Sequence, residues 1–543
     1  MTTKETPKWI EGLGFWNVYF IFKFALVYLG YLNLNVLGNA LLLLVLLLPL
    51  PSKGLRFVRT FGAVVVAVVL IYSESWLPGP ASIMSNADNI AGFSLSYMAE
   101  LAMDFINWTM LGWLAVLIIV YAIARHFVRL SVLTVGYFLV LAATPWWESL
   151  MAPAVEESPL PQVAQTTTAA PAATAETAVG KNIPATSETI AKWYSAFLDY
   201  EKERVAVLPA GLNAKDTPFD IVIMNVCSLS NDDLEAAELQ NHPVLSRFNI
   251  RFDHFNSATS YSGPATLRLL NAACGQPSHD GLYEGRRPEC EIMNRLDQLG
   301  FKQHMFLDHA GKYDNYIDTM REKAGLTAPL ESTGRYPVRY VGFDDEPIAD
   351  TLALLRDWHK KTRKEKERSV TLFNLIALHD GNRLPRQSHW EAFKPRAQIM
   401  LDDLNKFFDE LQRSGRKVMF VVVPEHGAAV RGDRVQAPRL RDIPSMRITE
   451  VPVLVKFFGL KDLPKDQIHV VGTTSYLALS TLIGKTLESN YFSAETGAVT
   501  LEELIKDLPE TNPVSENAQS VVLTYKERDY IRQKDENWVV YPK

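Results

Sequence analysis

The sequence predicts a membrane-embedded helical bundle followed by an α/β domain with a doubly wound, mostly parallel sheet. Long apolar runs are concentrated in the first 150 residues of the 543-residue chain, in which 48% of all residues are hydrophobic. After about residue 188, short apolar strands alternate with amphipathic helical stretches. This alternation is typical of parallel sheets that are covered by helices on both faces.

Five apolar segments each approach the roughly 20 residues that a transmembrane helix requires, although the second is short. They span residues 15–32, 36–50, 61–76, 106–124 and 130–147. We therefore expect residues 1–150 to form a membrane domain with five transmembrane helices.

Positive charges predict how these helices are oriented. The basic residues precede the first span or lie between the second and third and between the fourth and fifth: Lys4, Lys8, Lys53, Arg56, Arg59, Arg125 and Arg129. The remaining loops carry acidic residues without Lys or Arg. The positive-inside rule then places the N-terminus in the cytoplasm and everything after residue 150 outside the inner membrane.

Lys23 interrupts the first predicted span. An ammonium group inside hydrocarbon costs roughly 2.5–3.5 kcal/mol on insertion scales. Either the side chain snorkels to the interface or it meets a carboxylate of a partner protein. Both interpretations stay open at the level of the sequence.

A tether and a second domain follow the membrane region. Residues 151–187 are rich in Ala, Thr and Pro, which favours a flexible linker. In the domain over 188–543, we expect strands at 220–226, 303–307, 369–378, 418–423 and 451–458. We expect helices at 264–273, 351–365 and 394–414, and a terminal hairpin over 520–541.

The strand predicted at 418–423 runs directly into Glu425 and His426. Six consecutive apolar residues indicate a strand buried on both faces, and open α/β sheets build their sites at the carboxyl ends of such strands. Gly427 would let the chain bend sharply, so that both side chains reach one cation. Taken alone, such a pair more often marks only a strand end followed by a polar turn.

Three cysteines lie in the region predicted to be extracytoplasmic: Cys227, Cys274 and Cys290. An oxidising compartment favours a disulfide, and Cys274 with Cys290 is the local pair. Cys227 then stays unpaired at the carboxyl end of the strand 220–226. It is either an ordinary buried thiol or a metal ligand, which a zinc ion would hold as the thiolate.

The hydroxyl-rich segment 257–265 leads into a predicted helix, and Ser262 fits its N-cap position. A serine there can serve merely as a cap. The same geometry suits a phosphoryl nucleophile, because backbone N–H groups and the helix dipole face the attacking group and its phosphate. Zinc beside Ser262 would activate the hydroxyl and polarise the phosphorus. Since His379 also follows a predicted strand, we expect it to lie near Cys227 and Glu425 at one edge of the sheet.

Five segments of this chain resemble the family of bacterial cellulose phosphoethanolamine transferases, which are the G subunits of cellulose-secretion systems. They are residues 220–230, 257–264, 379–382, 424–427 and 440–444, and the resemblance extends from about Gly14 to Pro542. Lipid A phosphoethanolamine and lipoteichoic acid transferases of the alkaline phosphatase superfamily are similar, but generally have Thr, Glu and Asp where this chain has Ser262, Cys227 and Glu425. Sulfatases are further removed, because the segment after Ser262 lacks their signature arginine.

The resemblance implies an alkaline-phosphatase-like catalytic domain that uses zinc. It implies that four residues hold the metal: Cys227, Ser262, Glu425 and His426. Ser262 is the implied nucleophile.

The resemblance also places Tyr261, His379 and Arg441 along the active site. By their chemistry, His379 can carry a proton and Arg441 can offset phosphate charge. His309, after the strand 303–307, is a further candidate for this pocket, with a purely structural histidine as the alternative.

The implied reaction transfers phosphoethanolamine from phosphatidylethanolamine to glucosyl C6 hydroxyls of nascent cellulose, through a covalent intermediate on Ser262. Other subunits of the cellulose synthase complex would meet the membrane helices. One alternative is an enzyme of this fold that acts on lipid A or another periplasmic glycan, and another is a non-catalytic scaffold of a polysaccharide synthase. The net charge of −6 gives no sign of nucleic-acid binding.

Overall fold

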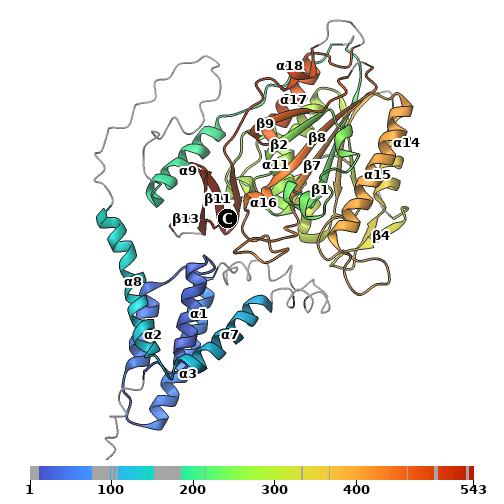
Figure 1. Cartoon of the computed structure of the whole chain (residues 1–543). Helices are drawn as coiled ribbons and strands as arrows, with labels where there is room; N and C mark the ends of the chain where they lie inside the picture. Colours follow the sequence, from blue (N-terminus) through green and yellow to red (C-terminus); the bar gives the residue numbers. More distant parts are fainter. Residues whose placement is uncertain are drawn as a thin grey trace, which may run out of the picture. The chain divides into compact units, whose positions relative to one another are not determined.

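The computed structural model describes residues 12–75, 98, 103, 108–151, 185–213, 216–331, 334–365, 367–461, 463–493, 499–533 and 537–542. These residues form two compact units, one with the helices up to residue 151 and one with every element from residue 187 onward (Figure 1). Lys4, Lys8 and nearly all of the predicted tether over 151–187 lie outside the described residues.

In the part that the structure describes, the first unit consists of helices joined by loops, with one isolated β-bridge between Leu32 and Ser75. Its helices are α1 (Trp16–Tyr28), α2 (Val36–Leu47), α3 (Lys53–Glu74), α7 (Trp108–Ala124) and α8 (Leu130–Met151), and each overlaps one predicted span. Among the described residues, only α3 has both the length and the apolar composition to cross a membrane, with a mean hydropathy of 2.0. The apolar stretches of the other four are 10–17 residues long. Five spans therefore stay a prediction.

Helix α3 begins earlier than the predicted third span. Lys53, Arg56 and Arg59 consequently lie in its first turns and not in a loop, which corrects the sequence interpretation. Arg59 Nη1 donates to the carbonyl oxygens of Leu48 at 2.7 Å and Leu46 at 3.1 Å. A cation at the C-terminal end of α2 complements that helix dipole and satisfies carbonyl groups that the helix leaves open.

Lys23 lies in a buried network that joins three helices. Its ammonium group is 2.7 Å from Glu74 Oε2, and both side chains are at most 2% exposed. Lys23 Nζ also donates to Asn39 Oδ1 at 2.6 Å, and Asn39 Nδ2 donates to Glu74 Oε1 at 2.5 Å. Lys23 does not snorkel, and the carboxylate that it meets comes from its own chain and not from a partner protein, because folding places Glu74 at the end of α3 against it.

The second unit is built on a seven-stranded sheet with the order β3-β6-β1-β7-β8-β2-β9. Its strands are β1 (Asp220–Cys227), β2 (Ile250–Asn256), β3 (Phe301–Leu307), β6 (Arg368–Leu375), β7 (Val418–His426), β8 (Glu450–Phe458) and β9 (Ile468–Thr474). Only β8 is reversed; it pairs antiparallel with both β7 and β2, while every other pair is parallel. The predicted mostly parallel sheet is confirmed, as a mixed sheet with one reversed strand.

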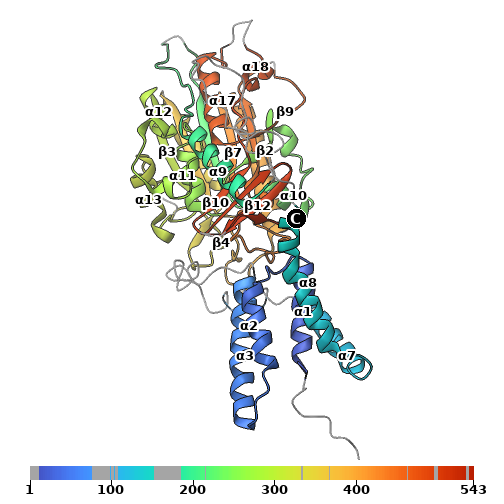
Figure 2. The same ribbon diagram turned by 90° about the vertical axis from the view of Figure 1, so that its left-hand side faces the viewer.

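Helices cover both faces of this sheet (Figures 1 and 2). They are α10 (Asn231–Ala236), α11 (Ser262–Leu270), α12 (Ile292–Gln298), α13 (Tyr316–Ala324), α14 (Thr351–Thr362), α15 (Phe393–Ser414), α16 (Met446–Thr449), α17 (Tyr476–Glu488) and α18 (Leu501–Ile505). Ile221 and Ile223 of β1 pack in the apolar layer with α11 and α17, whereas Val222 and Met224 pack with α14 and α15. Alternate side chains of one strand thus build two cores, which is the doubly wound arrangement.

Strands β2 and β9 were not predicted. In β2, Arg251, Asp253 and His254 interrupt the apolar pattern, so the segment does not look like a buried strand. It forms because β8 and β9 pair with it on both sides, and its charged side chains find partners such as Glu450, 2.9 Å from His254 Nδ1. The strand matters for function because it leads directly into the loop before Ser262.

A separate antiparallel sheet ends the chain. It contains β10 (Val514–Asn517), β11 (Ser520–Tyr525), β12 (Arg528–Gln533) and β13 (Val539–Val540), and its core includes Trp193 and Phe197 of α9 (Ser187–Lys202). The predicted terminal hairpin corresponds to β11 and β12, which turn at Lys526 and Glu527, both with positive φ as in a type I′ turn. Strand β10 was missed.

A further two-stranded sheet pairs β4 (Val338–Val341) with β5 (Pro347–Ala349).

Candidate active site

The ends of two central strands create the site. Val226 of β1 pairs with Pro424 of β7, but the next residue, Cys227, pairs with His426, so Glu425 is the extra residue of a bulge. Consecutive residues of a regular strand point to opposite faces. The bulge re-aims the backbone so that Glu425 and His426 can both approach Cys227.

Gly427 has a different role from the predicted one. It is absent from the residues with positive φ, and a Cβ at this position would lie 2.7 Å from Ser230 Oγ and 2.8 Å from Asp233 Oδ2. Asp233 Oδ2 also accepts hydrogen bonds from the Ser230 N–H and the Ala428 N–H. Glycine is therefore needed so that the loops after β1 and β7 can touch, and the predicted sharp bend was wrong.

Ser262 is the first residue of α11, whereas the sequence predicted it at the N-cap, which is the position just before the helix. Tyr261 takes the N-cap position and makes no side-chain cap. The Ser262 hydroxyl is consequently not used for capping. It donates to Cys227 Sγ at 3.3 Å and lies 3.4 Å from His426 Nε2, at the N-terminal end of the helix.

Four side chains converge here that are distant along the chain. Cys227 Sγ lies 3.7 Å from His426 Nε2, and Glu425 Oε2 lies 3.9 Å from the same nitrogen. Donor atoms of Cys227, Glu425 and His426 all lie within 4.8 Å of one another, and the three side chains are buried. With Ser262 this is the set expected from the sequence.

The carboxylate of Glu425 is satisfied on one side only. Its Oε1 accepts hydrogen bonds from Asn225 Nδ2 at 2.9 Å, Asn374 Nδ2 at 2.6 Å and Thr266 Oγ1 at 3.3 Å. Its Oε2 is fully buried and has no hydrogen-bond partner among the described residues. An unpartnered buried carboxylate oxygen is costly unless a cation satisfies it, so these residues fit a metal.

The imidazole of His426 is oriented to offer Nε2. Its Nδ1 lies 2.9 Å from the carbonyl oxygen of Gly427, so Nδ1–H donates there and Nε2 keeps its lone pair facing Cys227 and Ser262. Burial lowers the pKa of His426, which keeps the ring neutral. A thiol, a neutral imidazole and a carboxylate are ligand types that divalent transition-metal ions take in proteins, and here they lie together.

The thiol of Cys227 needs a cation to ionise. Burial, followed by the charge of Glu425, raises its pKa to about 12. Arg441 opposes this shift, and its Nη1 donates to Ser228 Oγ at 3.1 Å and lies 3.3 Å from His426 Nδ1. Arg441 thus brings positive charge directly beside the four converging residues.

His379, His309 and Tyr261 lie near this centre: His379 is close enough to lower the pKa of His426, His309 is close to Glu425, and Tyr261 directly precedes Ser262. His379 Nδ1 lies 2.7 Å from the Asp380 carbonyl oxygen, and burial together with Arg441 lowers its pKa to about 3. His309 Nδ1 lies 3.0 Å from Asp308 Oδ1. Burial raises the pKa of Glu425, and His309 is close enough to oppose that shift. The side chain of Tyr261 is 39% exposed.

The residues that hold Glu425 in place were not among the predicted site residues. Asn225 follows four apolar residues of β1, and Asn374 follows two apolar residues of β6, so both were visible in the sequence as polar side chains near a buried strand end. Thr266 follows Ser262 by four positions on α11, so both lie on one helix face. Tyr316 donates to Thr266 Oγ1 at 2.9 Å. Nothing in the local sequence pointed to Tyr316.

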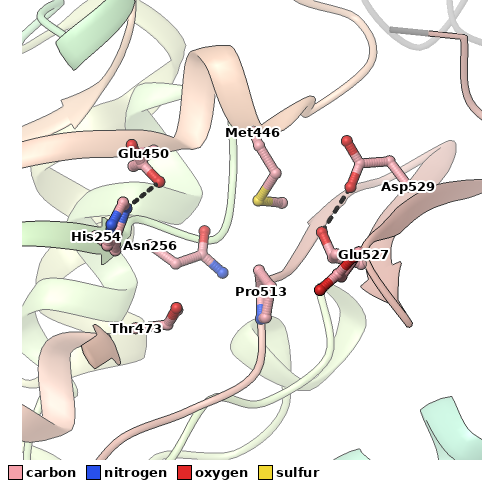
Figure 3. Close-up of a pocket in the computed structure, with 9 residues that line it drawn as sticks. His254, Asn256, Met446, Glu450, Thr473, Pro513, Glu527 and Asp529 are labelled. Carbon is pink, nitrogen blue, oxygen red and sulfur yellow. Dashed lines mark hydrogen bonds and ion pairs between the residues drawn. The ribbon is translucent and has the colours of Figure 1, made fainter. Parts of the chain in front are cut away.

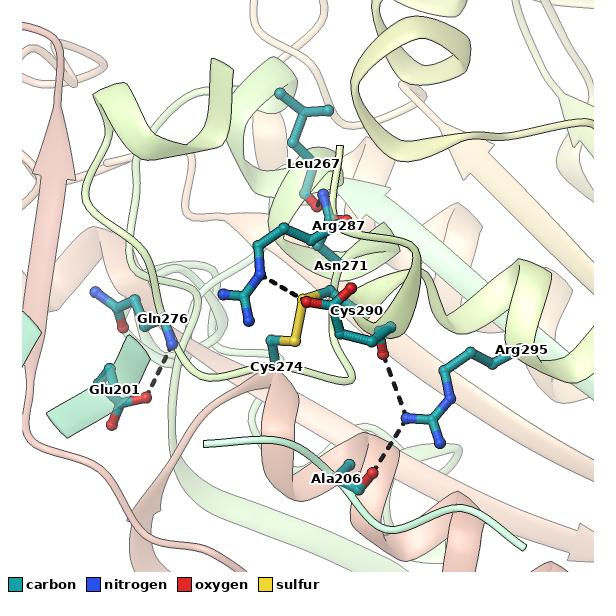
Figure 4. Close-up of a disulfide and its surroundings, with 10 residues drawn as sticks. Glu201, Ala206, Leu267, Asn271, Cys274, Gln276, Arg287, Cys290 and Arg295 are labelled. Atoms are coloured by element: carbon teal, nitrogen blue, oxygen red, sulfur yellow. Dashed lines mark hydrogen bonds and ion pairs between the residues drawn. A yellow bond between two sulfur atoms is a disulfide. The ribbon is translucent and has the colours of Figure 1, made fainter. Parts of the chain in front are cut away.

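A disulfide joins Cys274 to Cys290, as Figure 4 shows, and Cys227 is free and buried. The bridge links the segment after α11 to a short helical turn at Pro288–Cys290. Nearby, Arg295 donates to the carbonyl oxygens of Ala206 and Glu289. This neighbourhood supports α11 from the end opposite to Ser262.

A cavity of about 320 Å³ lies apart from these residues (Figure 3). Its lining comes from β2, α16, β8, β9 and the C-terminal sheet with the residue before it: His254, Asn256, Met446, Glu450, Thr473, Pro513, Thr524, Glu527 and Asp529. Three of these are carboxylates, but they belong to no cluster that could hold a metal ion in the part of the chain the structure describes. No predicted site residue lines the cavity.

Comparison with known proteins identifies the family. The C-terminal domain model described as "Cellulose biosynthesis protein BcsG C-terminal domain" matches residues 174–538, and the corresponding N-terminal domain model matches residues 16–143. The chain belongs to the BcsG family of cellulose biosynthesis proteins. The resemblance inferred from the residues is confirmed at the level of this family.

Two curated members are similar over nearly the whole chain. The Cellulose biosynthesis protein BcsG of Salmonella typhimurium (strain LT2) is 41% identical, covering 99% of this chain and 98% of the relative. The protein of the same name from Escherichia coli (strain K12) is 41% identical, covering 98% of this chain and 97% of the relative. Among solved structures, a protein in the alkaline phosphatase superfamily from Vibrio parahaemolyticus is 13% identical with a TM-score of 0.46, covering 63% of this chain and 86% of its own.

Proposed function

We propose that this BcsG-family protein is a zinc-dependent transferase that moves phosphoethanolamine from phosphatidylethanolamine to glucosyl C6 hydroxyls of nascent cellulose. The observation that carries the proposal is the convergence of Cys227, Ser262, Glu425 and His426, with one carboxylate oxygen of Glu425 left without a partner. These four residues would hold the ion, and when bound it would supply Lewis acidity and favour the ionised Ser262 hydroxyl.

The first step moves the headgroup to the protein. Ser262 Oγ forms a bond to phosphorus, the bond from phosphorus to the diacylglycerol oxygen breaks, one proton leaves Ser262 and one joins the departing diacylglycerol. Arg441, already beside His426, offsets the negative charge that the phosphate carries into the site. The N-terminal end of α11 presents backbone N–H groups to the same phosphate.

The second step releases the headgroup to the acceptor. A glucosyl hydroxyl oxygen bonds to phosphorus, the bond to Ser262 Oγ breaks, the acceptor loses one proton and Ser262 regains one. His379 takes this proton in our proposal because of its orientation: Nδ1–H donates to the Asp380 carbonyl oxygen, which leaves the lone pair of Nε2 free to accept. Its lowered pKa makes it a weak base, so it would hold the proton only briefly. His309 is oriented similarly by Asp308 and is a second proton carrier in this proposal.

The membrane region serves the proposed donor and partners. A lipid donor must be reached at the bilayer surface, and an anchored transferase stays at that surface. The positions of the basic residues along the chain, including Lys53, Arg56 and Arg59 in the first turns of α3, favour a multi-pass inner-membrane protein with a cytoplasmic N-terminus and a periplasmic catalytic domain. The membrane helices would also contact other subunits of the cellulose synthase complex.

The test is loading of Ser262. Full-length protein in detergent is incubated with phosphatidylethanolamine, and the peptide containing Ser262 is analysed by mass spectrometry for added phosphoethanolamine. We expect Ser262→Ala to abolish loading, while Ser246→Ala, an exposed serine that bonds only Pro243, loads normally. Ser260 and Thr259 are buried donors to Arg441 and Asn517, so they are poor substitutes. Normal loading of the Ser262→Ala variant would contradict the proposed nucleophile.

The acceptor is tested separately. Loaded protein is mixed with cello-oligosaccharides, with lipid A or with buffer, and release of the headgroup is followed. Release to cello-oligosaccharides alone supports cellulose. Release of the headgroup to lipid A, with none to cello-oligosaccharides, would assign the activity to another periplasmic acceptor. If the protein neither loaded Ser262 nor contained zinc, a non-catalytic scaffold would be favoured.

A further inference from the structure

We propose that Asn517, at the end of β10, is a positioning residue that holds the Ser262 loop and the Arg441 loop in one fixed arrangement. This inference rests on the transfer reaction proposed above. Asn517 is only 5% exposed, although it belongs to the small C-terminal sheet and not to the central one. Its side-chain amide bonds to both loops at once.

The contacts to the nucleophile loop come from both ends of the amide. Asn517 Oδ1 accepts hydrogen bonds from Thr259 Oγ1 at 2.9 Å and from the Ser260 N–H at 3.2 Å. Asn517 Nδ2 donates to Ser260 Oγ at 2.7 Å. The chain is thereby fixed two and three residues before Ser262.

The loop needs such support because its backbone is strained. Ala258 has a φ of 62°, a left-handed conformation that residues with a Cβ seldom adopt. Its N–H donates to Asn256 Oδ1 at 2.9 Å, and its carbonyl oxygen accepts the Glu516 N–H at 2.9 Å. Strand β10 therefore holds the strained residue through Glu516 and the residues after it through Asn517.

The same amide reaches the arginine loop. Asn517 Nδ2 donates to the Asp442 carbonyl oxygen at 2.9 Å and approaches that of Arg441 at 3.5 Å. The Ser260 hydroxyl donates to the Arg441 carbonyl oxygen and so completes a closed set of bonds. The guanidinium of Arg441, at the other end of that residue, contacts Ser228 and His426.

The expected consequence is a loss of alignment and not a loss of metal. Asn517 touches none of the four converging residues, so Asn517→Ala should retain zinc. Without Asn517, Ser262 and the guanidinium of Arg441 would no longer be held in fixed positions relative to each other. A misplacement of about 1 Å at a reacting centre can lower a rate roughly 100-fold. We expect Ser262 loading to slow by roughly 10- to 100-fold, with a much smaller change in KM for the lipid.

The experiment compares full-length variants in detergent for loading rate, KM, zinc content and thermal unfolding. Asn517→Asp keeps the side-chain shape and the acceptor oxygen but lacks the donor to Ser260 and Asp442, and it should also load slowly. Ser520→Ala is the matched control, because Ser520 Oγ contacts the Asp442 carbonyl oxygen at 3.2 Å from the same sheet without touching the nucleophile loop. It should load at nearly the wild-type rate.

A double-mutant cycle separates positioning from general stability. If Asn517 acts partly through Arg441, the combined Asn517→Ala and Arg441→Ala variant should lose at least fivefold less activity than the product of the two single losses. Fully additive losses would overturn the inference, as would wild-type loading by both Asn517 variants. Absence of loading in the wild-type protein would instead contradict the proposed function itself.

Discussion

Individual residues at the centre divide into those that offer an atom to a cation and those that only orient another side chain. Glu425 illustrates the division, since Asn225 and Asn374 saturate one oxygen and leave the other free. The three cysteines also differ in role. Cys227 lies among the converging donors, whereas Cys274 and Cys290 only join two segments.

Cysteine substitutions should therefore have separable effects. Loss of a residue that only orients a metal ligand typically lowers metal affinity by about 10- to 100-fold. We expect Cys227→Ala, which removes a ligand itself, to lower zinc affinity by more than this while the fold is retained. Cys274→Ala should keep zinc and lose about 3 kcal/mol of stability, the chain-entropy value for a loop of this size. Metal analysis after dialysis and calorimetric unfolding check both outcomes.

Cys290→Ala is the control for the disulfide, because it breaks the same bond from the other side. It should match Cys274→Ala in both measurements. If Cys227→Ala and Cys274→Ala lost zinc equally, the assignment of Cys227 to the metal would be wrong.

At the scale of helices and strands, irregular backbone features position the side chains of the site. The bulge of β7 brings Glu425 and His426 together, and β10 supports the strained loop before Ser262. In the helical unit, Lys23, Asn39 and Glu74 connect α1, α2 and α3 through buried polar bonds. A buried ion pair contributes little net stability while intact, but loss of one partner leaves an unpaired buried charge.

Breaking that network should destabilise the helical unit. We expect Lys23→Met to cost about 3–5 kcal/mol, because Glu74 then stays buried without its cation. Adding Glu74→Met in the same chain should restore most of the loss. Thermal unfolding of the full-length protein in detergent measures both changes.

An exposed ion pair provides the matched control. Lys192 and Glu188 are paired at 2.9 Å but remain more than two-thirds exposed, so Lys192→Met should change the unfolding temperature little. Equal effects of Lys23→Met and Lys192→Met would show that the buried network does not stabilise the helices.

At the scale of the whole molecule, the two apolar layers that cover the sheet contain none of the four residues proposed to bind the metal. Removal of zinc should therefore abolish Ser262 loading while the α/β domain stays folded. At a ligand concentration of about 100 times Kd, binding contributes about 2.7 kcal/mol, so the apo form should unfold a few degrees lower. Calorimetry before and after dialysis against a chelator checks this, and a collapse of the fold would contradict it.

The same experiment has a defined pH dependence. Because the pKa of Cys227 is raised to about 12, zinc must displace the thiol proton at any ordinary pH. Zinc affinity should fall as pH falls, by about tenfold per pH unit for that one proton. Competition with a chelator at pH 8, 7 and 6 measures the slope, and Cys227→Ala should flatten it.

Several features could be predicted because they are local. The run Val418–Val423 marked a buried strand, and the polar residues after it marked Glu425 and His426. Cys227 and Ser262 were found from a strand end and a helix start. Strand β2 was missed because Arg251 and Asp253 disrupt its pattern, and its existence depends on neighbouring strands.

By itself, the sequence determined the α/β class and the helical N-terminal region, because both depend on local periodicity. It also determined the family through the resemblance of short motifs, and that resemblance implied which residues would bind a metal. Only the tertiary structure decided that Glu74 partners Lys23, that a bulge aligns Glu425 with His426, and that Asn517 supports a loop 258 positions earlier in the chain. These outcomes depend on contacts between segments that are distant along the chain. No pattern within either segment encodes where the other will lie.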